Sequence, residues 1–200
     1  MAKSQNSSTN SGSDTAARIL DVAERLVQVR GFNGFSYADV AGELGITKAG
    51  LHYHYPGKAE LGEALIERYS ARFAAALEEI NRAGGSAGEK LAAYAAIYAD
   101  VLRDQRMCLC GMLAADYETL PEPMREAVIR FFDRNEEWLA GVLAQGEEDG
   151  ELSFAGSVRD SAQAIVSGLE GALLVARPYG DVDRFEAAAS GLLASVATVR

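Results

Sequence analysis

Apolar residues return every three or four positions along most of the chain, which is the spacing of one face of a helix packed against a core. Runs of β-branched residues are few, and proline and glycine clusters fall between the periodic segments. The pattern predicts about nine helices: one over residues 14–30, two short ones within 35–58, and others over 58–82, 87–105, 107–119, 122–149, 157–177 and 181–198. We therefore expect an all-α fold.

The two short helices within residues 35–58 are expected to meet at a tight turn. Ser36 is suited to cap the first helix, because its hydroxyl can accept a hydrogen bond from a free amide of the first turn. Gly45 stands where a helix ends in a left-handed residue, Thr47 can cap the second helix, and Pro56 stops it. This is a helix-turn-helix pattern, whose second helix enters the major groove of DNA. The alternative is an ordinary pair of helices in an all-α core.

The chemistry of the second helix favours the DNA-binding interpretation. Its outward positions are small, basic or aromatic, whereas a surface helix with no DNA to meet more often carries Glu and Lys. Small residues allow close approach to base edges, and Lys and Tyr reach phosphate oxygens. We expect phosphates to be held by Ser36, Tyr37, Thr47, Tyr53 and Lys58, and bases to be faced by Lys48, Ala49, Gly50 and His52.

Five segments follow one another in a specific order: 17–23 (ARILDVA), 31–32 (GF), 35–41 (FSYADVA), 44–55 (LGITKAGLHYHY) and 58–61 (KAEL). Over roughly residues 14–70 this order resembles the tetracycline-repressor-like (TetR/AcrR) family. The resemblance implies a one-component bacterial regulator, usually a repressor, that binds double-stranded DNA at a palindromic operator as a homodimer and releases it on binding a small effector. This chain has His52 where the family often has Tyr, and Tyr55 where it has Phe, so one phosphate contact is expected to shift by a position.

Composition divides the chain into three parts. Residues 1–13 are rich in Ser, Asn and Thr and predict a disordered tail without the apolar core of a signal peptide. Residues 14–60 form the predicted helix-turn-helix domain, and a long helix joins it to an effector-binding and dimerisation domain over 61–200. No apolar stretch reaches the roughly 20 residues that span a bilayer, so a cytoplasmic protein without membrane contact is expected.

The net charge of −10 is unusual for a protein that binds DNA, but its distribution explains it. Residues 1–60 hold six basic and six acidic side chains, whereas residues 61–200 hold 13 basic and 23 acidic ones. The acidity therefore lies away from the predicted DNA-reading helix, where it favours solubility.

Large apolar residues in the second domain suggest an effector pocket between its first helix and the helix over 157–177. The candidates for its lining are Tyr69, Phe73, Tyr94, Tyr98, Cys108, Met112 and Trp138, although core packing explains any single one of them better than ligand contact does. The last two helices are apolar over much of their circumference and predict a dimer interface, with plain core as the alternative. The expected interface residues are Ile165, Gly168, Leu169, Ala172, Leu173, Leu192, Leu193 and Val196.

No catalytic residue, metal site or cofactor is predicted. The sequence lacks a Gly-x-Ser-x-Gly elbow, a His-Glu-x-x-His motif and a phosphate loop. Cys108 and Cys110 are expected to be apolar filler, but Arg103 and Arg106 nearby leave a thiol-based redox or electrophile sensor as an alternative. A helical small-molecule-binding protein that does not bind DNA is the remaining alternative.

Overall fold

The computed structural model describes the backbone of residues 7–196 and the side chains of residues 13–195. Within those residues the elements are nine α-helices and two short 3-10 helices, which confirms the predicted all-α fold. The α-helices are α1 (Ser7–Arg30), α2 (Tyr37–Leu44), α3 (Lys48–His54), α4 (Lys58–Ala83), α5 (Ala87–Arg103), α6 (Leu109–Ala115), α7 (Glu122–Glu148), α8 (Val158–Ala176) and α9 (Val182–Val196). The 3-10 helices are η1 (Tyr117–Thr119) and η2 (Arg177–Tyr179).

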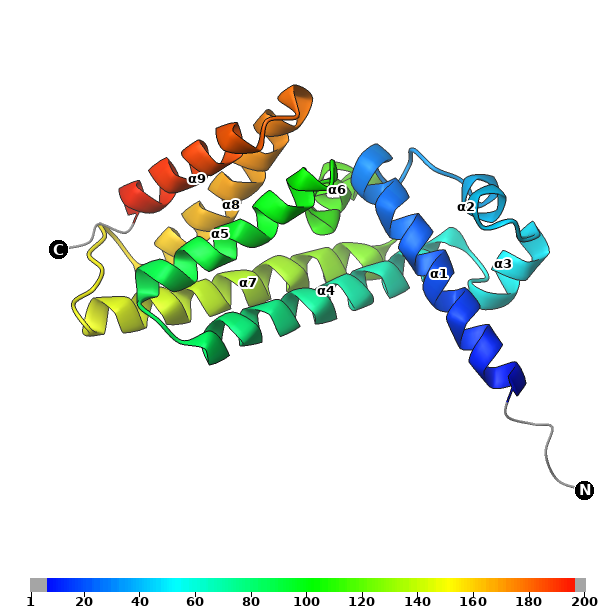
Figure 1. Ribbon diagram of the computed structural model, residues 1–200, viewed down its shortest axis with the longest axis horizontal. Helices are drawn as coiled ribbons and strands as arrows, with labels where there is room; N and C mark the ends of the chain where they lie inside the picture. The colour runs from blue at the N-terminus through cyan, green and yellow to red at the C-terminus, as the bar shows by residue number, and fades with distance from the viewer. Residues whose placement is uncertain (1–6, 197–200) are drawn as a thin grey trace, which may run out of the picture.

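The molecule has a head and a body (Figure 1). The head consists of α1, α2 and α3 at one end, and the body is an elongated bundle of α4 to α9. In the body α4 packs along α7, and α8 packs between α7 and α9. Among the described residues, no helix is both long and apolar enough to cross a bilayer.

Local signals in the sequence place several helix starts. Ser36 caps α2 in a reciprocal capping box: its side chain accepts from the amide of Asp39, and its own amide donates to the Asp39 carboxylate at 2.7 Å. The same pairing joins Ser86 and Glu89 at the start of α5. Because each box satisfies amides that have no partner inside the helix, these boundaries follow from the sequence.

Head and body share one continuous hydrophobic core, and polar contacts fix their relation, among them those of Glu24 and Asp116. The carboxylate of Glu24 in α1 is buried and pairs with Arg68 at 2.8 Å and with Arg72, both on α4. On another side of the head, the carboxylate of Asp116 after α6 accepts a hydrogen bond of 2.7 Å from the amide of Phe32. The head therefore contacts two separate elements of the body.

Two predicted boundaries differ from the structure. The predicted disordered tail is wrong for residues 7–13, because α1 begins at Ser7; residues 1–6 lie outside the described part of the chain. Serine and asparagine are only modestly unfavourable in helices, so a packed helix can extend backwards through them. The single helix predicted over 107–119 is α6 followed by η1, since Cys108 caps α6 and Asp116 ends it.

Candidate nucleic-acid interface and effector region

The turn between α2 and α3 is built as its residues predict. Gly45 ends α2 in the left-handed conformation, with φ of +67°, which is strained for any residue with a side chain. Thr47 then caps α3, and its hydroxyl accepts a hydrogen bond of 3.0 Å from the amide of Gly50. Leu51 is fully buried and anchors α3 to the head. These contacts fix which face of α3 points away from the protein.

The face of α3 opposite Leu51 is open to solvent. Lys48, Ala49, His52 and Tyr53 are exposed, and Tyr53 keeps 84% of its surface accessible. The imidazole of His52 lies against the ring of Tyr37 at 4.8 Å, with Nδ1 2.9 Å from the carbonyl oxygen of Pro56. Exposed aromatic and basic groups on one short helix form a surface suited to phosphates and base edges.

Two of the side chains predicted to contact phosphates are half-buried and form hydrogen bonds within the protein. The Tyr37 hydroxyl donates to the carbonyl of Gly57 at 2.5 Å, and burial raises the pKa of this phenol to about 12. The ammonium of Lys58 lies between the rings of Phe32 and Phe35 and donates to both of their backbone carbonyls, at 2.5 and 2.6 Å. Burial also lowers the pKa of Lys58. Sequence reasoning missed these roles because they depend on carbonyls 18 to 26 residues away.

We expect Lys58→Met to lower the free energy of unfolding by about 2 kcal/mol, because two carbonyls lose a charged donor. Methionine keeps the apolar stem that crosses the two rings. Thermal or urea unfolding measures the change, and DNA affinity compared where both proteins are folded should stay nearly the same. A variant of unchanged stability with much weaker DNA binding would return Lys58 to the DNA-contacting surface.

The predicted effector residues gather in one aromatic cluster in the body. Phe73 of α4 lies 6.0 Å from the rings of both Tyr94 and Tyr98 on α5, and Trp138 of α7 stacks on Tyr94 at 5.6 Å. Tyr69 joins the cluster through Phe73 at 6.2 Å. Cys108 is buried beside it, and Met112 is half-buried. Five of the seven predicted residues are therefore joined by direct ring contacts.

Hydrogen bonds satisfy only part of this cluster. The hydroxyls of Tyr94 and Tyr98 are 3.1 Å apart, and Tyr94 donates to Asn135 at 3.3 Å. The indole Nε1 of Trp138 is buried and has no hydrogen-bond partner among the residues that the structure describes. Burial raises the pKa of both tyrosines, which keeps them neutral donors. The cluster is apolar with a few polar atoms, which is the composition of a small-molecule site.

Sequence reasoning missed the charged member of this region, Glu170 on α8. Its carboxyl packs so closely against Gly111 that a β-carbon there would collide with Oε2. Its Oε1 is buried without a hydrogen-bond partner among the described residues. Burial raises the pKa of the carboxyl to about 7, and a hydrogen bond from the Cys108 thiol acts in the opposite direction. The available signal was that Glu170 is the single charged residue between positions 161 and 176.

The thiols are buried and neutral. Burial, then the charge of Glu170, raise the pKa of Cys108 well above that of a free thiol, and the same two causes act on Cys110. The predicted activation by arginines is wrong in this arrangement. Arg103 pairs with Asp100 at 2.6 Å and with Glu186 on α9, and Arg106 pairs with Asp104.

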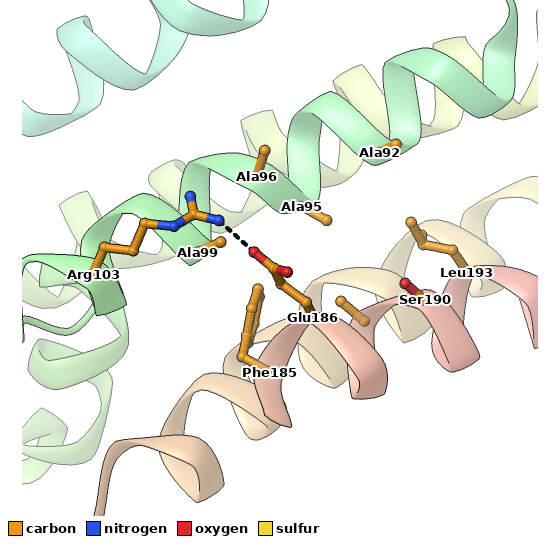
Figure 2. Close-up of a pocket in the computed structure, with 10 residues that line it drawn as sticks. Ala92, Ala95, Ala96, Ala99, Arg103, Phe185, Glu186, Ser190 and Leu193 are labelled. Carbon is orange, nitrogen blue, oxygen red and sulfur yellow. Dashed lines mark hydrogen bonds and ion pairs between the residues drawn. The ribbon is translucent and has the colours of Figure 1, made fainter. Parts of the chain in front are cut away.

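A groove of about 230 Å³ lies between α5 and α9 (Figure 2). Alanines of α5 form one wall, Phe185, Ser190 and Leu193 form the other, and the Arg103–Glu186 ion pair crosses one end. A larger groove of about 410 Å³ lies between α4 and α7. Its lining includes Phe131, whose ring is 5.2 Å from Phe73, so this second groove adjoins the aromatic cluster.

Three of the predicted dimer residues belong to the protomer's own core. Ile165, Leu169 and Leu173 are fully buried against the body, because α8 packs on both α7 and α9. Gly168 packs against Leu192 so tightly that a β-carbon would collide. Of the others, Ala172, Leu192 and Leu193 are half-buried, and the side chain of Val196 lies outside the described residues. The large apolar side chains that α8 leaves exposed are instead Leu174 and Val175, at 59% and 58%.

Comparison with known proteins gives consistent results. Residues 19–65 match the profile of bacterial regulatory proteins of the tetR family, and residues 87–192 match that of the tetracyclin repressor-like C-terminal domain. The HTH-type transcriptional repressor NemR of Escherichia coli (strain K12) is 27% identical over 175 residues, covering 82% of this chain and 84% of NemR. The structure of E. coli NemR in its reduced form has a TM-score of 0.79 at 25% identity, covering 93% of this chain and 98% of that one. A TetR-family regulator from Agrobacterium tumefaciens reaches a TM-score of 0.89 at 31% identity, covering 94% of this chain and all of the other.

These matches correspond to the two parts of the molecule. The first includes α2, α3 and the start of α4, and the second runs from α5 into α9 and covers more than half of the chain. The head presents an exposed recognition helix, and the body holds an aromatic cluster of the composition found in ligand sites. The chain therefore belongs to the tetracycline-repressor (TetR) family of ligand-responsive, DNA-binding transcriptional regulators.

Proposed function

We propose that this protein is a cytoplasmic repressor that binds a palindromic operator as a homodimer and releases it when a small molecule binds in the body. The observation that carries the proposal is the outward face of α3, which is held in place by Thr47 and Leu51 and leaves Lys48, His52 and Tyr53 exposed. Two such helices in a two-fold pair would enter successive major grooves about one helical turn, or a modestly larger step, apart.

The proposed contacts are fewer than the sequence predicts. Lys48, Ala49, Gly50 and His52 face the bases, while the exposed Ser36, Thr47 and Tyr53 lie at the edge of the same surface and contact phosphates. Tyr37 and Lys58 support the surface from inside. With few cations in contact, affinity depends on pairing two heads on one duplex.

Selection of bound sequences from a random duplex pool tests the proposal. We expect an inverted repeat whose half-sites are separated by about one helical turn or slightly more. Affinity for the selected sequence should fall as salt rises, and a scrambled duplex of the same composition should bind far more weakly. Recovery of no enriched sequence, with weak binding to every duplex, would support the alternative of a helical ligand-binding protein.

We place the dimer contact on the exposed faces of α8 and α9. Leu174 and Val175 are large apolar side chains that the protomer leaves uncovered, and the exposed side of α9 is dominated by alanine, glycine and serine. Small residues let helices approach closely, and a pair of helices from each copy forms a four-helix bundle around a two-fold axis.

Leu174→Asp is expected to raise the dimer dissociation constant by about a hundredfold or more, since the two-fold axis buries the new charge twice. Sedimentation or size-exclusion chromatography over a dilution series measures the change. Ile129→Asp is the matched control, because Ile129 is also an exposed apolar residue, at 47%, but lies on α7. If both variants weakened the dimer equally, or if neither weakened it, α8 would not form the interface.

Thiol sensing remains a second candidate because NemR, one of the relatives, has a structure described as its reduced form. In this chain the arrangement is unfavourable to it, since Cys108 and Cys110 are buried and their pKa values are raised. A reactive cysteine needs its thiolate and access to solvent.

We therefore expect N-ethylmaleimide to label both cysteines of the folded protein on the order of a hundredfold more slowly than the urea-unfolded protein. Mass spectrometry of quenched samples measures the rates. Cys108→Ser and Cys110→Ser identify which thiol reacts. Rapid labelling of Cys108 accompanied by operator release, and absence of release in Cys108→Ser, would favour the sensor instead.

A further inference from the structure

Glu170 on α8 is a half-buried acid that pairs with no cation among the described residues. Its Oε1 is buried and without a hydrogen-bond partner among those residues. The thiol of Cys108 donates a hydrogen bond to this carboxyl, but no cation neutralises it. Burying a carboxyl without a cation costs free energy, so a purely structural role would be served better by an apolar residue. The unpaired oxygen is therefore informative about function.

The titratable groups that interact with this carboxyl come from three helices and are all neutral at physiological pH. They are Tyr69 on α4, Tyr94 and Tyr98 on α5, and Cys108 and Cys110 at α6. Burial raises the pKa of each of them, and none supplies a positive charge. The region thus combines one carboxyl, neutral thiols and a set of aromatic rings.

The aromatic rings near this carboxyl contact one another across α4, α5 and α7. Tyr69 lies 5.6 Å from Phe131, and Phe73 is in edge contact with Tyr94, Tyr98 and Phe131. Ring faces attract cations, above all those that are weakly hydrated, and a nearby carboxylate adds to that attraction. A site with both features and without basic residues selects against anions.

We propose that the effector of this protein is an organic cation, an amine or a quaternary ammonium, whose charged nitrogen lies against the carboxylate of Glu170 and the rings of Tyr69 and Tyr98. The proposal rests on the proposed function, in which a small molecule binds in the body. It names the chemical class of that molecule and the residue that selects it.

The groove between α4 and α7 adjoins this region. Phe131 lines the groove and also packs on Tyr69 and Phe73 of the aromatic cluster. Glu63, Glu67 and Glu126 stand along the groove with Arg130 and Arg134. The net charge of −10, which lies in the body, raises the local concentration of cations.

Binding of a permanent cation should depend on pH in a definite direction. The pKa of Glu170 in the free protein is raised to about 7, and the cation binds only the ionised form. Affinity should therefore fall about tenfold per pH unit below 7 and level off above 8. The tyrosines and cysteines that face Glu170 have raised pKa values and do not titrate in this range.

The test uses the full chain and three compounds of similar shape: benzyltrimethylammonium, its uncharged carbon isostere neopentylbenzene, and phenylacetate. Calorimetry measures binding to wild type, Glu170→Gln and Glu186→Gln between pH 6 and pH 8. Glu186 is the matched control, because it is an acid that lines the α5–α9 groove and is already paired with Arg103. We expect only the cation to bind wild type tightly, with the stated pH dependence, and Glu170→Gln to weaken it at least tenfold.

Several results would overturn the proposal. They are equal binding of the cation to wild type and Glu170→Gln, loss of binding in Glu186→Gln instead, preference for phenylacetate or the uncharged compound, and failure of the cation to bind. Operator affinity without any compound is measured separately. A protein that binds its operator but not the cation supports the proposed function and contradicts the effector class. A protein that binds the cation but no operator supports the effector class and contradicts the proposed function.

Discussion

Lys48→Ala is expected to weaken binding to the selected operator by about thirtyfold or more while leaving the free energy of unfolding unchanged. Lys48 is the first residue of α3 and is exposed beside Ala49. A side chain that contacts a base contributes about 1–3 kcal/mol, and a symmetric dimer loses that contribution twice. Fluorescence anisotropy with labelled operator at fixed salt measures the change.

The salt dependence of the same variant separates two kinds of contact. If Lys48 touches a phosphate, the slope of log affinity against log salt should become shallower by about one unit per subunit; if it reads a base, discrimination between operator variants should fall instead. Lys90→Ala is the control, because it removes the same charge from α5 in the body. Full affinity in Lys48→Ala would remove this face of α3 from the DNA interface.

Glu24→Ala is expected to cost about 3 kcal/mol of unfolding free energy, the largest stability effect that we predict. Glu24 is only 5% exposed and pairs with Arg68 and Arg72. Removing one partner of a buried ion pair leaves charge without compensation, which costs about 3–5 kcal/mol. We expect a loss at the lower end of this range of unfolding free energies, because Arg68 keeps a second carboxylate partner, Asp21, at 2.7 Å.

Urea unfolding at matched protein concentrations measures this effect, since dimerisation makes stability depend on concentration. Glu43→Ala is the control. Glu43 also pairs with an arginine of α1, Arg25, but both side chains are more than 40% exposed, so its loss should cost no more than about 1 kcal/mol. Equal losses in the two variants would show that burial does not govern the Glu24 pair.

The head was predictable from sequence to the extent that its signals are local. Ser36, Gly45 and Thr47 each act on amides or a backbone angle within three residues, so their roles can be recognised without a tertiary structure. Lys58 could not be assigned in this way. Its partners are the carbonyls of Phe32 and Phe35, and only the folded arrangement turns its ammonium inward.

For the body, the sequence indicated which residues are large and apolar, but not which of their faces are buried within the protomer. Aromatic residues at helical spacing correctly indicated a cluster, since Tyr94 and Tyr98 are four positions apart and meet on one face of α5. The same spacing cannot tell which apolar face of α8 meets a second copy and which meets α7. Ile165 and Leu173 lie on the inner face, and the exposed Leu174 is next to one of them.

The short helix α6 constrains how this protein can be re-engineered. One end begins at Cys108, beside Glu170, and just past the other end Asp116 accepts the amide of Phe32 in the head. Inserting a single residue would rotate everything beyond it by about 100°. A chimera that joins a foreign head to this body must therefore keep the length of α6. It must also keep a backbone amide at the position of Phe32, or the hydrogen bond to Asp116 that holds the head on the body will be lost.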